Sequence, residues 1–150
     1  MASYSGYGSA AVGTDKTILN LFQPGSNMVR AALVEFVLGC SSTPADLTGL
    51  FQLKRTTAVG TEGSGFTPLP LDPAFKAASC DYGVAHSVEP TYTSANELYG
   101  FGLHQRATHR WIAEPGRGLV IPATASNGIG LKSSSHGGTP TMVATMFHEE

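Results

Sequence analysis

The stretch WIAEPGRGLVIPATASNGIGLK, residues 111–132, decides how the glycines of this chain are to be interpreted. A phosphate-binding loop needs glycines directly after a strand and a helix directly behind them. Here Pro115-Gly-Arg-Gly118 leads into Leu119-Val-Ile121 and then Pro122, which is typical of a short strand that ends at a proline. The stretch therefore predicts turns between strands, with one turn over residues 114–118, and it does not predict a nucleotide site.

A second turn signal in the same stretch is the pair Asn127-Gly128. Both residues accept positive φ, and the pair is therefore a strong signal for a β-hairpin. It predicts a tight turn that leads into a strand over Ile129–Lys132.

The rest of the chain repeats this pattern of short apolar runs between turn residues. Its 18 glycines and nine prolines disfavour long helices. Strand-forming runs occupy residues 17–23, 28–38, 50–57, 83–88, 98–105, 106–112, 119–121, 129–132 and 142–147, with a bend near Arg106. About eight short strands with turn signals roughly every ten residues predict an all-β fold, a jelly-roll-like β-sandwich.

A few segments leave an alternative open or suggest other structure. Met28–Leu38 alternates like a strand, but a helix capped by Gly39 is the alternative, because Ala and Leu favour helices. Asp72-Pro73 predicts a short helix through Ala78, since Asp is a good N-cap and Pro suits the first helical position. Residues 42–46 suggest a single helical turn, and residues 133–139 a flexible loop.

One predicted strand has unequal faces. Gly100 and Gly102 alternate with Tyr99, Phe101 and Leu103, so one face is bulky and the other almost bare. A bare face allows another backbone or layer to approach closely.

The first sixteen residues are small, polar and rich in glycine. Tyr4 and Tyr7 are their only aromatic side chains. Such a segment buries too little apolar surface to hold itself in place. We expect residues 1–16 to form an extended, flexible N-terminal arm that orders against a partner, and residues 17–150 to form one β-sandwich domain.

Composition argues against several classes of function. The net charge is −2, charged residues make up 13% of the chain, and no long basic run occurs, which argues against direct nucleic-acid binding. No apolar run approaches the ~20 residues needed to span a bilayer, and the first residues do not look like a signal peptide. We therefore expect no membrane partner and synthesis in the cytoplasm. For Cys40 and Cys80 we favour two free buried thiols over a disulfide.

The search for catalytic or metal-binding patterns yields little. No G-x-S-x-G motif occurs, and Ser64 lies between glycines in a long loop that is typical of a linker. His104 and His109 flank the expected bend; exposed sheet histidines are the simpler interpretation and a zinc or nickel site the alternative. We expect no catalytic residue, no cofactor and no metal, and hence no enzyme.

Three arginines, Arg106, Arg110 and Arg117, lie near the single tryptophan, Trp111. One interpretation is ordinary surface charge, with an arginine stacked on an aromatic ring. The other is a contact patch for an acidic protein surface. The residues alone do not decide between them.

The chain resembles a known family over residues 98–129. The runs that carry the resemblance are Leu103–Trp111, Ile112–Gly116, Leu119–Ala125 and Asn127–Ile129, and the acidic end Phe147-His-Glu-Glu150 is also similar. They resemble the capsid decoration, or cement, proteins of tailed bacteriophages.

This resemblance implies a jelly-roll protein on the outer surface of the virion. Such proteins form homodimers or homotrimers on an icosahedral head and bridge neighbouring major capsid protein subunits, and the family has no catalytic residues to transfer. On this basis we expect capsid or subunit contacts through Tyr4, Tyr7, Arg106, Arg110 and Arg117.

Two other functions are consistent with a β-sandwich. The first is a carbohydrate- or receptor-binding module of a phage tail fibre, since jelly rolls often serve that way. The second is a small hydrolase with unusual site geometry. A glycan site usually presents several exposed aromatic side chains, whereas the single tryptophan here lies in a predicted strand.

Overall fold

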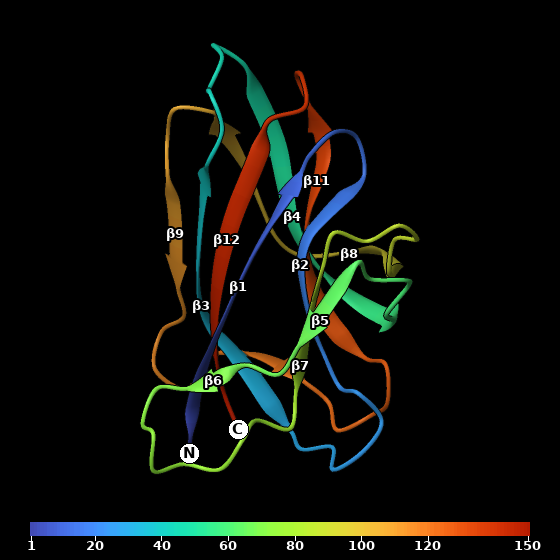
Figure 1. Cartoon of the computed structure of the whole chain (residues 1–150), viewed down its shortest axis with the longest axis vertical. Helices are drawn as coiled ribbons and strands as arrows, with labels where there is room; N and C mark the ends of the chain where they lie inside the picture. Colours follow the sequence, from blue (N-terminus) through green and yellow to red (C-terminus); the bar gives the residue numbers. More distant parts are fainter.

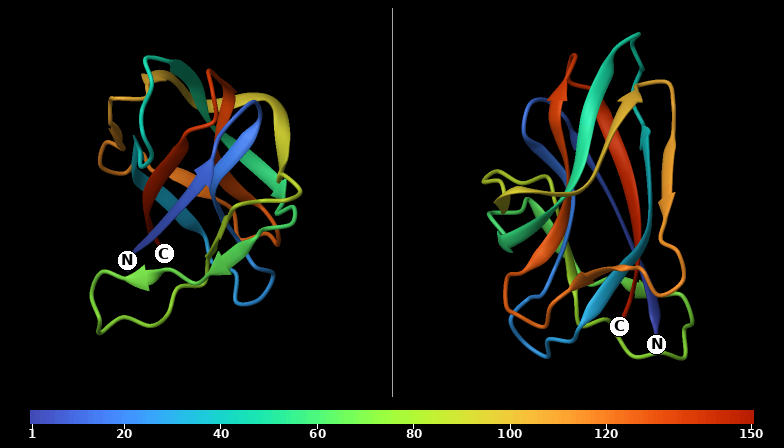
Figure 2. Two further views of the ribbon diagram at one scale, coloured as in Figure 1. Left: turned by 45° about the horizontal axis from the view of Figure 1, so that its top comes forward. Right: turned by 180° about the vertical axis from the view of Figure 1, so that it is seen from behind.

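The computed structural model describes residues 1–150, except for the side chains of Ala95 and Asn96. Two antiparallel sheets face each other as a sandwich, and the described chain contains strands and turns but no helix (Figures 1 and 2). The first sheet has the order β10 (Leu119–Ile121), β3 (Ala31–Cys40), β12 (Thr141–Glu149), β1 (Ser3–Ala11) and β6 (Leu69–Pro70), with β9 (His109–Ile112) also paired to β3. The second has the order β5 (Ser64–Phe66), β7 (Asp81–Val84), β2 (Lys16–Phe22), β11 (Gly128–His136), β4 (Thr48–Ala58) and β8 (Thr91–His104). The predicted all-β class is confirmed.

The core lies between the two sheets and follows from alternation along the strands. In β12 every second residue is buried: Met142, Ala144, Met146 and His148. Residues of one face of a strand point to the same side, so the apolar members of this series pack against the second sheet. The largest fully buried side chains of the core include Phe36, Phe51, Leu19, Leu53 and Ile129.

Most of the predicted strands are present. Five predicted runs lie inside an observed strand or extend past its end by one residue. They are residues 17–23 in β2, 50–57 in β4, 98–105 in β8, 119–121 in β10 and 142–147 in β12. The run that could have been a helix forms strand β3 instead, with Leu33, Phe36 and Leu38 fully buried. The predicted bend near Arg106 is a turn between β8 and β9.

The predicted N-terminal arm is wrong for residues 3–11. They form β1, which pairs with β12 along its whole length, from Ser3 opposite Glu149 to Ala11 opposite Thr141. The inner face of β1 carries glycines because the second sheet fills the space in front of it. A Cβ at Gly6 would lie 2.3 Å from the ring of Tyr82. The strand is therefore held by core side chains that other strands contribute, which a local count of apolar residues misses.

The predicted short helix over residues 72–78 is also wrong. Asp72 does cap one turn: its Oδ1 accepts a hydrogen bond from the N–H of Ala74, and its carbonyl accepts one from Phe75. The chain then continues without helical hydrogen bonds. The single helical turn expected over residues 42–46 is likewise absent from the described chain.

Two predictions in the C-terminal half of the chain need correction, one of a hairpin turn and one of a loop. Asn127-Gly128 does not form a hairpin, because β10 and β11 lie in different sheets and the segment between them crosses from one to the other. The residue with positive φ there is Ser126, at 64°. The expected loop over residues 133–139 is shorter, since residues 133–136 extend β11.

Candidate functional site

The three arginines do not form a free basic patch. Each lies on or beside β9, and each forms an ion pair within the chain: Arg106 with Asp46 (2.9 Å), Arg110 with Glu35 (2.7 Å) and Arg117 with Glu114 (3.2 Å). Their side chains are at least 60% exposed, so these pairs contribute little to stability. The ring of Trp111 stacks on Phe36, with centroids 5.8 Å apart. The arginines remain candidates for contact with a partner, but each is already paired with an acidic residue of the same chain.

The two tyrosines of β1 have opposite environments. Tyr4 is fully buried; its ring stacks on His148 and its hydroxyl donates to the carbonyl of Lys76 at 3.2 Å. Tyr4 is therefore a core residue, which corrects its assignment to a contact surface. Tyr7 is 63% exposed and remains a candidate for such a surface.

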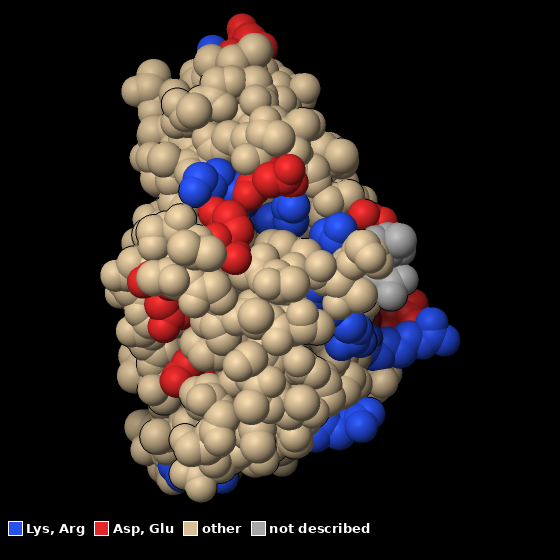
Figure 3. All heavy atoms as spheres, turned by 90° about the vertical axis from the view of Figure 1, so that its right-hand side faces the viewer, with Lys and Arg blue, Asp and Glu red and all other residues tan. Residues whose placement is uncertain are grey.

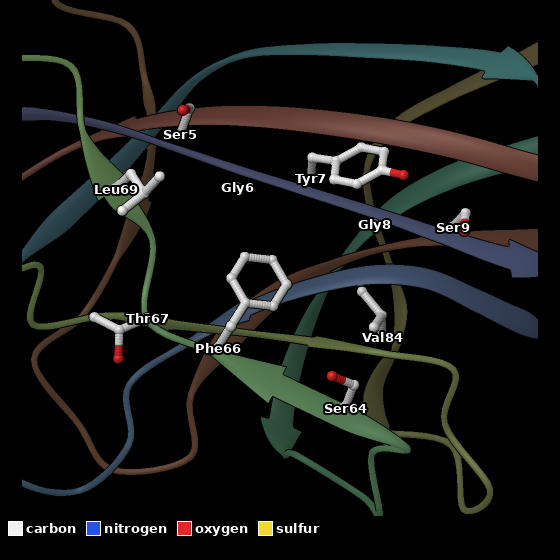
Figure 4. Close-up of a pocket in the computed structure, with 10 residues that line it drawn as sticks. All are labelled: Ser5, Gly6, Tyr7, Gly8, Ser9, Ser64, Phe66, Thr67, Leu69 and Val84. Carbon is white, nitrogen blue, oxygen red and sulfur yellow. The ribbon is translucent and has the colours of Figure 1, made fainter.

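An uncharged groove lies beside Tyr7, between β1 and the segment that contains β5 and β6 (Figure 4). It has a volume of about 510 Å³, and its apolar lining includes Phe66, Leu69 and Val84. β6 pairs only with Tyr4 and Ser5, so β1 becomes an edge of the first sheet where it passes the groove. Exposed strand edges are natural points for association with another polypeptide.

A second candidate site is buried where β7 meets the end of β12. Cys80, His148 and Glu150 each offer one ligand atom, and these atoms lie within 4.8 Å of one another. In the described part of the chain they form the only group of three or more such residues. Cys80 and His148 are fully buried, and the Glu150 side chain is 3% exposed. We call these three residues the buried cluster.

Hydrogen bonds fix the carboxylate of the buried cluster. Glu150 Oε1 accepts the backbone N–H of Cys80 at 2.8 Å, and both carboxylate oxygens accept from the N–H of Ser79. His148 Nε2 lies 3.3 Å from Oε1. Burial alone would raise the pKa of Glu150, but the hydrogen bonds from His148, Cys80 and Ser79 outweigh it and lower the pKa to about 2. Burial, and then the charge of Glu150, raise the pKa of the Cys80 thiol.

Two further side chains complete the surroundings of the cluster. The Tyr82 hydroxyl lies 3.2 Å from the carbonyl of Met146 and 3.1 Å from His148 Nδ1. Gln23 Nε2 donates to Cys80 Sγ at 3.2 Å. The sequence interpretation missed this site because Cys80 lies about seventy positions before His148 and Glu150, and no local motif joins them. The signal that could have found it is the alternation in β12, which places His148 in phase with the buried methionines.

A buried histidine, His86, follows β7 and lies outside the buried cluster. His86 is 5% exposed, and neither of its ring nitrogens has a hydrogen-bond partner among the described residues. Burial lowers its pKa; the charge of Glu89 opposes this effect and the charge of Lys16 adds to it. A buried imidazole without partners is expected to stay neutral.

The alternative metal site at His104 and His109 gains no third ligand among the described residues. His109 stacks on Phe101 at 4.0 Å, and its Nε2 lies 3.2 Å from the Tyr99 hydroxyl. His104 Nε2 lies 3.9 Å from the carboxylate of Asp46. Both cysteines are free thiols, as favoured from the sequence, although only Cys80 is buried and Cys40 is partly exposed.

Comparisons of the chain with protein-family models, with curated proteins and with solved structures give no match. Among the residues that the structure describes, none forms a helix long and apolar enough to cross a membrane.

Proposed function

We propose that this chain is a capsid decoration protein that binds the outside of a phage head and cements neighbouring major capsid protein subunits. In this proposal it is a structural component of the virion and not an enzyme. The observation that carries the proposal is the family resemblance over residues 98–129, a stretch that contains the second half of β8, all of β9 and β10, and the start of β11.

The proposal includes a jelly-roll topology, which the strand pairing supports. The first long strand pairs with the last (β1 with β12), the second with the second last (β2 with β11), and β4 with β8. β3, which lies between β2 and β4 in the chain, pairs with β9 and β10, which lie between β8 and β11. This nested pairing is what an antiparallel ribbon gives when it is rolled into two sheets, the arrangement of a jelly roll.

The surface also favours contact with protein over contact with nucleic acid. Figure 3 shows basic and acidic side chains next to one another across the middle of one face, with larger uncharged areas above and below them. A surface that neutralises phosphates needs unpaired positive charge. Mixed charges and uncharged areas instead suit a protein partner.

The groove of β1 is the surface that we assign to contact with the capsid or with a second subunit of a homodimer or homotrimer. Tyr7 and Leu69 line it and are 63% and 75% exposed. Leu71 and Phe75, which follow in the chain, are 55% and 45% exposed. Exposed apolar side chains gathered in one region mark interaction surfaces in soluble proteins.

The experiment is co-sedimentation of the purified chain with empty heads of the matching capsid. Fully burying an apolar side chain is worth about 1.5–3 kcal/mol, so replacing both Tyr7 and Leu69 by Ser should weaken binding by about 100-fold or more. Leu50→Ser is the matched control, because Leu50 is 42% exposed on β4, which β11 and β2 separate from β7 in the second sheet.

Failure of the unmodified chain to sediment with heads would refute the decoration role. Equal losses for the groove variant and for Leu50→Ser would refute the assignment of the surface. Clear binding on a glycan array would instead support the carbohydrate-binding alternative.

A further inference from the structure

We propose that the buried cluster of Cys80, His148 and Glu150 is a zinc site. A thiolate, an imidazole nitrogen and a carboxylate oxygen are the three donor types that Zn²⁺ takes from proteins. β7 and the end of β12 bring these donor atoms within 4.8 Å of one another. This inference is independent of the decoration role.

The spacing of two of the donors suits a tetrahedral ion. In a tetrahedron with Zn–N and Zn–O bonds of about 2.0–2.1 Å, the two ligand atoms lie roughly 3.3 Å apart. The distance from His148 Nε2 to Glu150 Oε1 is 3.3 Å. Three protein donors leave one tetrahedral position free.

The hydrogen bonds around His148 turn its Nε2 toward Glu150. The carbonyl of Met146 can only accept, so the Tyr82 hydroxyl donates to it. The Tyr82 oxygen then accepts from His148 Nδ1–H, which leaves Nε2 as the ring nitrogen that faces the carboxylate. Nε2 donates its proton to Glu150 Oε1 at 3.3 Å. A Zn²⁺ ion would take the place of this proton, between the nitrogen lone pair and the carboxylate oxygen.

The neighbours of the cluster behave as outer ligands of a metal site do. A metal-binding histidine usually donates its second ring N–H to a partner that fixes its orientation, and Tyr82 occupies that place. The side-chain N–H of Gln23 donates to Cys80 Sγ and would stabilise a thiolate bound to the metal. Both Gln23 and Tyr82 are fully buried.

A hollow in the surface lies next to residues that contact the cluster. A polar hollow of about 630 Å³ is lined by Ser79, Asp81 and Val29 among others. Ser79 donates to Glu150, and the carbonyl of Val29 accepts from Gln23. Binding of Zn²⁺ would release the thiol proton of Cys80 and the proton that His148 Nε2 shares with Glu150.

The test is titration of the tag-free chain with Co²⁺, followed by displacement with Zn²⁺. Co²⁺ serves as an optical probe, because a thiolate ligand gives a near-ultraviolet charge-transfer band. We expect one Co²⁺ to bind per chain and to give this band, and we expect the band to disappear when Zn²⁺ displaces Co²⁺. Zn²⁺ should also raise the melting temperature.

Variants separate the cluster from other thiols and histidines. Cys80→Ser should remove the band, whereas Cys40→Ser, which changes the other cysteine, should keep it. Tyr82→Phe keeps the buried ring but removes the partner of His148 Nδ1, and should weaken metal binding by about 10–100-fold. Each variant is first checked for a native circular-dichroism spectrum.

Three results would overturn the proposal. The first is the absence of a thiolate band in the unmodified chain together with an unchanged melting temperature. The second is a band that survives in Cys80→Ser. The third is an unchanged metal affinity in Tyr82→Phe. If Cys80→Ser fails to fold, the affinity of Tyr82→Phe decides.

Discussion

A methyl group added at Gly6 tests whether β1 lies inside the sandwich. The Cβ of Gly6→Ala would lie 2.3 Å from two ring carbons of Tyr82. Carbon atoms in contact prefer about 3.5–4.0 Å, so the ring would have to retreat by more than about 1 Å. Tyr82 is fully buried and its hydroxyl is hydrogen-bonded, so it has little room to move.

The size of the effect follows from two opposing contributions. Overpacking a tight core costs about 1–3 kcal/mol. The loss of backbone freedom in the unfolded chain returns about 0.4–1 kcal/mol. We expect Gly6→Ala to lower the free energy of unfolding by about 1–2 kcal/mol, and the melting temperature by roughly 2–8 °C for a chain of this size.

The matched control is Gly102→Ala on β8. A Cβ there meets nothing within 4 Å, and neither Gly102 nor Gly6 has positive φ. This variant should be as stable as the original chain or gain up to about 1 kcal/mol. Urea denaturation followed by circular dichroism measures both variants. If Gly6→Ala were as stable as Gly102→Ala, β1 would not pack against Tyr82, and the placement of residues 3–11 would be refuted.

Further predictions concern the core, the thiols and pH. Replacing Phe36, which is fully buried among aromatic rings, by Ala should lower the free energy of unfolding by about 3–5 kcal/mol in urea denaturation. A decrease of less than about 1 kcal/mol would contradict the place of Phe36 in the core. A thiol reagent should modify Cys40 in the native chain and Cys80 only after unfolding, so equal rates would contradict the burial of Cys80. Burial lowers the pKa of His86, so the folded state binds fewer protons than the unfolded state, and stability should fall as pH drops below the unfolded pKa of about 6.5. His86→Gln should flatten the dependence of unfolding free energy on pH between about 7 and 5, and an unchanged slope would contradict this assignment.

The sequence predicted the strands whose own side chains alternate. In β12 buried and exposed residues follow one another strictly, and β2 and β4 are rich in strand-forming residues. β1 was missed because its inner positions Gly6 and Gly8 bring no side chain to the core. The apolar groups that hold it belong to Tyr82 and Val84, which are more than seventy residues away in the chain.

Local signals failed where tertiary pairing overrides them. Asn127-Gly128 has the chemistry of a hairpin turn, but the strands on either side pair with β3 and β2 in different sheets. Asp72 caps a turn as expected, yet no helix follows.

The candidate sites were only partly accessible from sequence. Tyr7 is exposed as expected, whereas Tyr4 is part of the core. The buried cluster joins Cys80 to residues about seventy positions later, and no local motif encodes such a contact. The burial of His148 was visible in the alternation of β12, but its partners were not.

The most direct test of the central claim is a reconstruction of the intact phage particle by electron cryomicroscopy. The claim is that this chain acts by contact on the outside of a capsid. We predict ordered density on the outer surface of the shell that fits the two-sheet sandwich and touches neighbouring capsid subunits. A shell without such density, or the chain located only on the tail, would contradict the claim.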